Sequence, residues 1–307
     1  MILVTGCTGF IGSRLISNLD NVICVARRDT FSRNTVEGVE YIEADLTDRA
    51  KTRELLQKVK PELVINLASK TPVKYSYNDT SYMNNAIIAY NIAMAEAPLI
   101  HASTAEVYPY TQYPHYYVES DVYTTPSSPY AVSKIASEML LKERKEKTII
   151  LRPTNTIGRP VSRLPQEARV YFFEKTVTSM LEGKREIHYG SDPRSSRQWM
   201  HWSDHVKAYL HVIKNIDKME GVYNVSVHYL NYSHILTLEE TVNIIADMLD
   251  WEGKVTWMNN PRPVEPNYLL LNSDKIHKTG LEIDDPISAL RKGVKDIKEE
   301  YESHKHF

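Results

Sequence analysis

The sequence predicts an α/β fold, a doubly wound parallel sheet followed by a smaller, mixed α/β domain. Over the first 150 residues short apolar runs alternate with helix-like stretches, a glycine-rich loop follows the first run, and the alternation stops near residue 155. Runs that are apolar on both faces are typical of strands in a buried parallel sheet, and helices between them provide right-handed crossovers. We therefore expect two domains, 1–155 and 156–307, with some segments of the second returning to the first.

Six short apolar runs are the expected strands of the first domain. They span 2–5, 22–26, 41–44, 63–68, 99–102 and 148–151. Each is only four to six residues long, which suits a strand and is too short for a buried helix.

Helices are expected between and after these runs. Apolar residues recur at helical spacing after the first run, at Ile11, Leu15 and Leu19. Further helices are expected at 47–59, with Thr47 as N-cap, and from about 127 to 142. Those of the second domain are expected at 166–182, 203–215, 237–249 and 286–302.

Composition excludes several classes of protein. The 307 residues carry 37 Lys+Arg against 39 Asp+Glu, so the chain lacks the basic balance of a nucleic-acid binder. No apolar run approaches the ~18 residues of a membrane span, and the start of the chain has no basic segment typical of a signal peptide. Two cysteines make neither a disulfide framework nor a metal-ligand pair. We expect a cytoplasmic protein that binds neither nucleic acid nor membrane.

A GxxGxxG loop joins the first strand to the first helix. Glycine allows positive φ at the turn and lets a pyrophosphate approach the amides at the helix N-terminus, while the last glycine permits close helix–strand packing. The residues expected to contact a dinucleotide here are Gly6, Gly9, Phe10, Ile11 and Gly12. We expect Cys7 to be a small residue that faces the cofactor and not a nucleophile. The structural alternative is a glycine turn that only joins strand to helix.

The end of the second strand indicates which dinucleotide binds. NAD sites usually have an acid there for the ribose 2′-hydroxyl, whereas NADP sites bring in arginine. This strand ends without an acid and is followed by Arg27 and Arg28, whose guanidinium groups bind phosphate bidentately. NADP is therefore the predicted cofactor, with NAD possible and a solvated arginine pair as the structural alternative. We expect Asp45 and Leu46 near the adenine, with Asp45 accepting from its amino group.

Tyr130 and Lys134 form a YxxxK pair on the helix expected at 127–142. The i, i+4 spacing places the phenol and the ammonium on one face. A nearby cation stabilises a phenolate, as a tyrosine that acts as general acid and base requires. Such a pair alone is often accidental, but behind a glycine-rich loop it indicates catalysis.

Ser103 and Thr104 follow the fifth expected strand at its carboxyl end, where open α/β sheets bind ligands. A hydroxyl at this position can bind the substrate oxygen whose proton Tyr130 moves. The structural alternative is a Ser/Thr turn that caps a helix.

With these elements in order, the chain resembles the extended short-chain dehydrogenase/reductase family, which contains nucleotide-sugar epimerases, dehydratases and 4-keto reductases. Segments 63–69, 151–158 and 197–204 also resemble family segments. The resemblance implies a Rossmann domain for cofactor and a second domain for nucleotide sugar. It implies that Tyr130 is the acid–base residue, that Lys134 holds the nicotinamide ribose, and that Thr104, supported by Ser103, binds the reacting oxygen. The further contacts implied are Ala68, Ser69 and Pro153 for the cofactor, and Glu106, Asn155, Arg197 and Arg262 for the substrate.

The predicted function is hydride transfer on a nucleotide sugar by an NADPH-dependent 4-keto reductase. The alternatives are an NAD-dependent 4-epimerase, a 4,6-dehydratase and a non-enzymatic dinucleotide-binding sensor. Dehydratases of the dTDP-glucose type have Thr-Asp-Glu where this chain has Thr104, Ala105 and Glu106, which disfavours that reaction. Arg27 and Arg28 resemble part of the NADP-binding loop of GDP-mannose 4,6-dehydratases, and with Glu106 they keep a dehydratase of that type open. In the family the helix near 130–144 pairs across a dimer interface, so a homodimer is expected. His201 and His205 lack a third ligand, and no metal site is expected.

Overall fold

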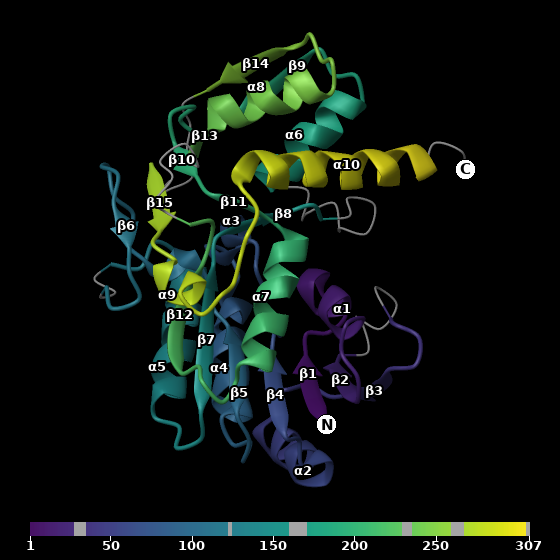
Figure 1. The fold of residues 1–307 in the computed structure, drawn as a ribbon, viewed down its shortest axis with the longest axis vertical. Helices are drawn as coiled ribbons and strands as arrows, with labels where there is room; N and C mark the ends of the chain where they lie inside the picture. Colours follow the sequence, from purple (N-terminus) through teal and green to yellow (C-terminus); the bar gives the residue numbers. More distant parts are fainter. Residues whose placement is uncertain (28–34, 122–124, 160–170, 229–234, 259–266, 305–307) are drawn as a thin grey trace. The chain divides into compact units, whose positions relative to one another are not determined.

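A computed structural model describes residues 1–27, 35–121, 125–159, 171–228, 235–258 and 267–304, which form two compact units (Figure 1). Unit 1 comprises Met1–Val107, Ser128–Pro153 and Val206–Tyr223. Unit 2 comprises Tyr108–Ser127, Thr154–His205 and Asn224–Phe307. Two of the predicted site residues, Arg28 and Arg262, lie outside the described residues.

The centre of unit 1 is a seven-stranded sheet with the order β12-β7-β5-β4-β1-β2-β3. Its strands are β1 (Ile2–Thr5), β2 (Val22–Ala26), β3 (Glu40–Glu43), β4 (Leu63–Asn66), β5 (Leu99–Ala102), β7 (Thr148–Pro153) and β12 (Gly221–Val225). Every neighbouring pair from β3 to β7 is parallel. The strand order reverses between β1 and β4, and ligands bind open α/β sheets at such a reversal. The prediction of a doubly wound α/β fold is confirmed.

Helices cover both faces of this sheet; in Figure 1 α7 lies in front of the strands, and α4 and α5 lie behind them. The helical elements of unit 1 are α1 (Phe10–Ile16), α2 (Arg49–Val59), α3 (Val73–Ser76), η2 (Thr80–Met83), α4 (Asn84–Ile92), η3 (Ala105–Val107), α5 (Pro129–Lys142) and most of α7 (Trp202–Lys214). The cap predicted for α2 is one residue early. Asp48, not Thr47, is its N-cap, because the Asp48 carboxylate accepts hydrogen bonds from Ala50 N and Lys51 N.

The hydrophobic core of unit 1 lies between the sheet and these helices. Strand residues such as Leu3, Val64 and Leu99 pack against Leu55 of α2 and Ile92 of α4, and all are buried. This packing fixes the carboxyl ends of the strands, so the loops that leave those ends start from rigid positions.

Unit 2 is built from small sheets and longer helices. Its sheets have the orders β13-β10-β15-β6, β11-β8 and β14-β9. The strands are β6 (Tyr116–Tyr117), β8 (Asn155–Ile157), β9 (Glu186–Tyr189), β10 (Ser196–Arg197), β11 (Trp199–His201), β13 (Leu236–Thr237), β14 (Lys254–Trp257) and β15 (Tyr268–Leu271), and the helices are α6 (Phe172–Leu181), α8 (Leu238–Met248), α9 (Asp274–His277) and α10 (Pro286–His304). Phe173, Trp199, Ile245 and Leu290 are among its buried core residues. Within the described ranges no helix is long and apolar enough to cross a membrane.

Candidate active site

The glycine-rich loop folds so tightly that its glycines are needed for space. Gly6 has φ +66°, and a Cβ there would lie 2.6 Å from the backbone of Leu67 and Ala68. A Cβ on Gly12 would lie 2.3 Å from Gly6 O. The N-cap of α1 is Gly9, which has no side chain to accept from the first-turn amides of Phe10 and Ile11. Backbone amides at a bare helix N-terminus fit the pyrophosphate of a dinucleotide.

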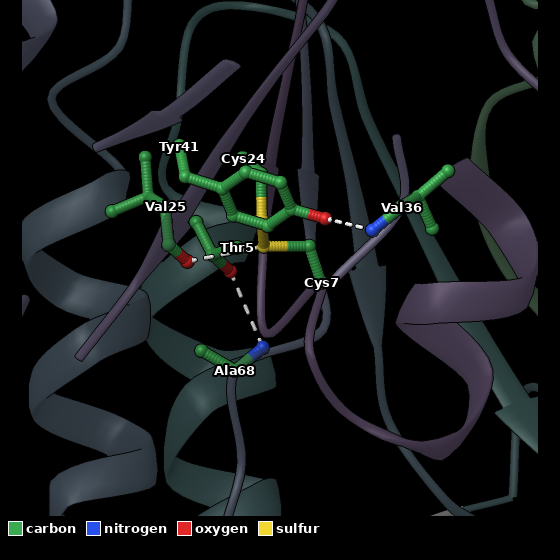
Figure 2. The surroundings of a disulfide bond; sticks show 7 residues. All are labelled: Thr5, Cys7, Cys24, Val25, Val36, Tyr41 and Ala68. Atoms are coloured by element: carbon green, nitrogen blue, oxygen red, sulfur yellow. Dashed lines mark hydrogen bonds between the residues drawn. A yellow bond between two sulfur atoms is a disulfide. The ribbon is translucent and has the colours of Figure 1, made fainter. Parts of the chain in front are cut away.

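Cys7 lies inside this loop, and its side chain is completely buried. It forms a disulfide with Cys24 of β2, and neither cysteine is exposed (Figure 2). The expectation that Cys7 faces the cofactor is therefore wrong. Cys24 pairs in register with Val4 of β1, and Cys7, which follows Val4 by three residues, is close enough to bond to it.

The residues predicted to determine which dinucleotide binds, and to contact its adenine, follow β2 and β3. Arg27 is exposed just after β2. Asp45 accepts hydrogen bonds from Thr47 Oγ1 at 2.7 Å and Thr47 N at 2.9 Å. These bonds, and to a smaller extent the charge of Arg27, lower the pKa of Asp45, which stays ionised at neutral pH. Leu46 is buried in the core. The contact of Asp45 with adenine stays a prediction.

Tyr130 and Lys134 both lie on α5, which begins sharply because Ser128 caps it and Pro129 occupies its first position. Lys134 is 2 % exposed, and its Nζ donates a hydrogen bond to the carbonyl oxygen of Ala102 at 2.8 Å. The same Nζ lies 6.0 Å from the centre of the Tyr130 ring. Burial lowers the pKa of Lys134 to about 8, while the charge of Glu138 opposes this shift. Lys134 therefore carries its proton at neutral pH and loses it slightly above.

Tyr130 is held by neighbours that the sequence did not reveal as site residues. The ring of Tyr82 meets it edge to face, with ring centres 6.2 Å apart. Ser133 Oγ donates to the Tyr130 carbonyl oxygen at 2.7 Å and accepts from Asn85 Nδ2 at 3.0 Å. Burial raises the pKa of Tyr209, and the neighbouring Tyr130 raises it further, so the Tyr209 phenol stays protonated. Neither Tyr82 nor Tyr209 belongs to a recognisable motif, so no local signal marked them.

The exit of β5 carries two hydroxyl residues with different surroundings. Thr104 is partly exposed, and its Oγ1 accepts a hydrogen bond from the backbone N–H of Glu106 at 3.2 Å. Ser103 is buried and donates its hydroxyl to Glu138 of α5. Glu138 in turn forms an ion pair with Arg152 of β7, with Nε–Oε1 at 2.9 Å and Nη2–Oε2 at 2.6 Å. Thr104 is therefore the hydroxyl left at the edge of the sheet, because that of Ser103 is committed to the interior.

A row of buried polar side chains continues from β5 across β4 to β1. Asn66 accepts a hydrogen bond from Thr5 Oγ1 at 2.6 Å, and its Nδ2 lies 3.1 Å from His101 Nδ1. Burial, and next the charge of Lys134, hold the pKa of His101 well below its usual value, so this imidazole is neutral at pH 7. The row lies at the carboxyl ends of the strands, beneath the loops that carry the predicted site.

The remaining cofactor residues of unit 1 lie at neighbouring strand ends. Ala68 and Ser69 follow β4, where Ala68 N donates to Thr5 Oγ1 at 3.2 Å (Figure 2). Pro153 ends β7. All three side chains are partly exposed, as contact with a ligand requires.

The predicted substrate residues of unit 2 are placed by β8 and β10. Asn155 lies on β8 opposite Trp199 of β11, and its Nδ2 lies 3.5 Å from Gln198 O. Arg197, on β10, is buried and donates to the carbonyl oxygen of Ser196 at 2.9 Å. Within the described part of the chain no group of three or more His, Cys, Asp or Glu side chains is arranged to hold a metal ion.

Comparison with known proteins gives a consistent result. Residues 2–226 match the NAD dependent epimerase/dehydratase family. The dTDP-D-glucose 4,6-dehydratase of Homo sapiens is 24% identical and covers 99% of this chain and 91% of its own length. The UDP-glucose 4-epimerase of Mycolicibacterium smegmatis is 30% identical over 45% of this chain and 49% of its own length.

Solved structures share the fold. A UDP-glucuronic acid 4-epimerase from Bacillus cereus in complex with UDP-glucuronic acid and NAD aligns with a TM-score of 0.81 at 20% identity, covering 97% of this chain and 99% of that one. A UDP-N-acetylglucosamine 4-epimerase from Methanobrevibacter ruminantium aligns with a TM-score of 0.81 at 23% identity, covering 97% and 98%. At these identities the likeness establishes the architecture.

Proposed function

Because the chain belongs to the NAD-dependent epimerase/dehydratase family, we propose that it transfers a hydride between a nicotinamide dinucleotide and a nucleotide-linked sugar. The observation that carries this proposal is the group formed by Tyr130, Lys134 and Thr104. The first two share a helix, and the amine of Lys134 is bonded to the strand end that leads to Thr104. A purified protein that oxidises or reduces no nucleotide sugar, alone or with added dinucleotide, would contradict it.

The dinucleotide is held by the glycine loop and the strand ends beside it. Gly6, Gly9 and Gly12, with the amides of Phe10 and Ile11, bind the pyrophosphate, because no side chain caps the helix that begins after Gly9. Lys134 holds the nicotinamide ribose. Asp45 and Leu46 lie near the adenine, and Ala68, Ser69 and Pro153 line the nicotinamide side. When bound, the nicotinamide supplies the hydride donor or acceptor.

Tyr130 moves the proton that accompanies hydride transfer. Its phenol gives a proton to the sugar oxygen when a carbonyl is reduced and takes one when an alcohol is oxidised. The Lys134 ammonium stabilises the phenolate that forms. Thr104 binds the same sugar oxygen, and Ser103 supports Thr104 from the buried side. In unit 2, Asn155, Arg197 and Arg262 are the proposed contacts to the nucleotide sugar, together with Glu106 of unit 1; arginine is suited to a diphosphate.

For the net reaction we propose reduction of a 4-keto sugar with NADPH. Arg27, exposed after a strand that ends without an acid, supports this choice together with Arg28, because an arginine there binds a 2′-phosphate. A reductase consumes NADPH in each turnover, which favours a cofactor that exchanges with solution.

A second candidate is an NAD-dependent 4-epimerase. The curated relatives include a UDP-glucose 4-epimerase, and the UDP-glucuronic acid 4-epimerase that shares the fold was solved with NAD. A 4,6-dehydratase is the third, supported by the human relative and by Glu106 beside Thr104.

Mass spectrometry separates the three reactions. The enzyme is incubated with a panel of nucleotide sugars and their 4-keto forms, each with NAD or NADPH. A reductase adds two hydrogens to the sugar and consumes NADPH. An epimerase leaves the mass unchanged but alters the chromatographic retention, and a dehydratase releases water.

A homodimer completes the proposal. Six large apolar side chains on or beside the paired helices α4 and α5 are exposed: Met83, Ile87, Tyr90, Val132, Met139 and Leu140. Residues 83, 87 and 90 recur at helical spacing, as do 132 and 139, so each helix presents an apolar stripe. A second copy of the chain is the partner we propose for this face.

A further inference from the structure

Glu138 is a completely buried acid beneath the candidate active site, and the proposed chemistry gives it no role. The carboxylate is 0 % exposed and Arg152, its ion-pair partner, is 1 % exposed. Removing two charges from water costs free energy that their attraction recovers only in part, so a buried ion pair is a weak source of stability. The buried position of Glu138 therefore indicates a role other than stability.

Glu138 ties α5 to the exit of β5. It follows Lys134 by four residues, which places both side chains on one face of the helix. Lys134 donates to the carbonyl oxygen of Ala102, and Glu138 accepts from the hydroxyl of Ser103. Two consecutive residues of the strand exit are thus bonded to the helix that carries Tyr130, and the next residue is Thr104. Arg152 holds both carboxylate oxygens and fixes their direction.

We propose that Glu138, oriented by Arg152, is a positioning residue that acts through Ser103 to hold Thr104 in line with Tyr130. The inference rests on the proposed function, because that function gives Thr104 and Tyr130 their roles. Glu138 itself is buried and acts on Thr104 through Ser103.

The charge of Glu138 has a second effect on the site. It raises the pKa of Lys134 against the lowering caused by burial, and so helps Lys134 keep its proton. Among the described residues, the titratable or charged groups near Lys134, Tyr130 and Glu138 include His101 on β5, Arg152 on β7, Tyr82 on η2 and Tyr209 on α7. Loss of the carboxylate charge therefore lowers the pH at which Lys134 deprotonates.

Two variants separate the effect of the hydrogen bond between Ser103 and Glu138 from the effect of the Glu138 charge. In Ser103→Ala the hydroxyl is lost and all charges remain. We expect kcat to fall about tenfold, the effect of losing a hydrogen bond to a charged group. KM for the sugar, the Kd of the dinucleotide and the pH profile should stay unchanged. In Glu138→Gln an acceptor for Ser103 remains but the charge is lost, so the basic limb of the kcat profile should move to lower pH.

Ser137→Ala is the matched control, because Ser137 is also fully buried on α5 but donates only to the carbonyl oxygen of Ser133 within the helix. Thermal unfolding reports whether each variant folds. If Glu138→Gln does not fold, Ser103→Ala alone tests the inference. A folded Ser103→Ala enzyme with the kcat of Ser137→Ala overturns the inference. Absence of activity in the unaltered protein would instead overturn the proposed function.

The disulfide supports a second, independent inference. Cys7 and Cys24 have Cα atoms 5.8 Å apart, and both are completely buried (Figure 2). Cys7 follows Gly6 in the pyrophosphate loop, and Cys24 precedes Arg27 by three residues on β2. The bond therefore joins the two segments that would bind the diphosphate and the ribose phosphate of one dinucleotide.

We infer that this pair is a thiol–disulfide modification site that sets how tightly the loop binds a dinucleotide. The crosslink limits the conformations of the empty loop, and a site organised before binding loses less entropy when the ligand arrives. Reduction by a dithiol breaks the S–S bond. Each cysteine gains a hydrogen, and the dithiol becomes a disulfide. The loop is then held only by contacts such as Gly9 N to Gly6 O at 3.0 Å. This inference rests on the proposed cofactor site.

Calorimetric titration with NAD and with NADPH tests it on protein oxidised by glutathione disulfide and on protein that was reduced by dithiothreitol while unfolded and then refolded, because both sulfurs are buried in the folded chain. Reduction should raise the Kd by about threefold or more, as expected for lost preorganisation. Cys24→Ala leaves the loop sequence intact and should bind like the reduced protein, with or without dithiothreitol. Equal Kd values in the two states, or two free thiols in the oxidised sample after denaturation, overturn the inference. If neither dinucleotide binds in either state, the cofactor site is refuted as well.

Discussion

Lys134 donates a hydrogen bond from its Nζ to the carbonyl oxygen of Ala102, which lies 2.8 Å away. This bond crosses from α5 to the end of β5, so the helix that carries Tyr130 and the strand exit that leads to Thr104 form one rigid piece of unit 1. The amine is therefore placed by the fold before any ligand arrives, as a preorganised catalytic group requires.

Replacement of Tyr130 by phenylalanine removes the proposed acid–base group with little change in shape. We expect kcat to fall about 10²–10⁴-fold, the usual contribution of general acid–base catalysis. The Kd of NADPH should not change, since the ring and its contact with Tyr82 remain. Steady-state kinetics and fluorescence titration measure the two quantities. Tyr113→Phe, on an exposed residue of unit 2, is the control. Full activity of Tyr130→Phe would refute the assignment.

The pH profile should report Lys134. Its pKa is lowered from 10.5 to about 8 because the ammonium is buried, so the group is charged below pH 8 and neutral above it. Reduction of a carbonyl needs a protonated Tyr130 and the cation beside it. We therefore expect kcat for reduction to be level near pH 7 and to fall as the pH rises through about 8. A rate that stays level to pH 10, measured with stable enzyme, would show that the charge of Lys134 is not needed.

The sequence predicted those parts of the fold that local pattern determines. The runs at 2–5, 22–26 and 99–102 are the observed β1, β2 and β5, because buried parallel strands are apolar on both faces. The third strand was placed one residue late. It is the edge strand β3, whose terminal residues Glu40 and Glu43 are exposed, so its apolar signal is weak.

The candidate site was predictable only where spacing within one element carries it, as for Tyr130 and Lys134. The links of Ser103 to Glu138 and of Tyr130 to Tyr209 join residues distant in sequence, and no local pattern contains them. The disulfide did have a signal. The chain has two cysteines, one just after the first expected strand and one inside the second, and in the structure these two strands are neighbours.

The choice between the two dinucleotides can be tested at Arg27, which is exposed after β2. If it binds a 2′-phosphate, Arg27→Ala should raise the Kd of NADPH by about ten- to a hundredfold, the range for a lost hydrogen bond to a charged group. The Kd of NADH should change much less, because NADH has no such phosphate. Both nucleotides are titrated against the unaltered protein and against Arg27→Ala, so the change in the Kd of NADH is the control for the change in the Kd of NADPH. Equal effects on the two would remove the support for NADP.

The paired helices α4 and α5 provide the last prediction. Their exposed side chains include Ile87 and Met139, at 41 % and 59 % exposure, and covering such apolar area is a strong driving force for association. A lysine at either position would place a charge in the proposed dimer interface. We expect light scattering to give the mass of two chains for the unaltered protein and of one chain for Ile87→Lys with Met139→Lys. Met258→Lys, on a methionine of unit 2 that is 56 % exposed, should remain a dimer. A single-chain mass for the unaltered protein at micromolar concentration would contradict the homodimer.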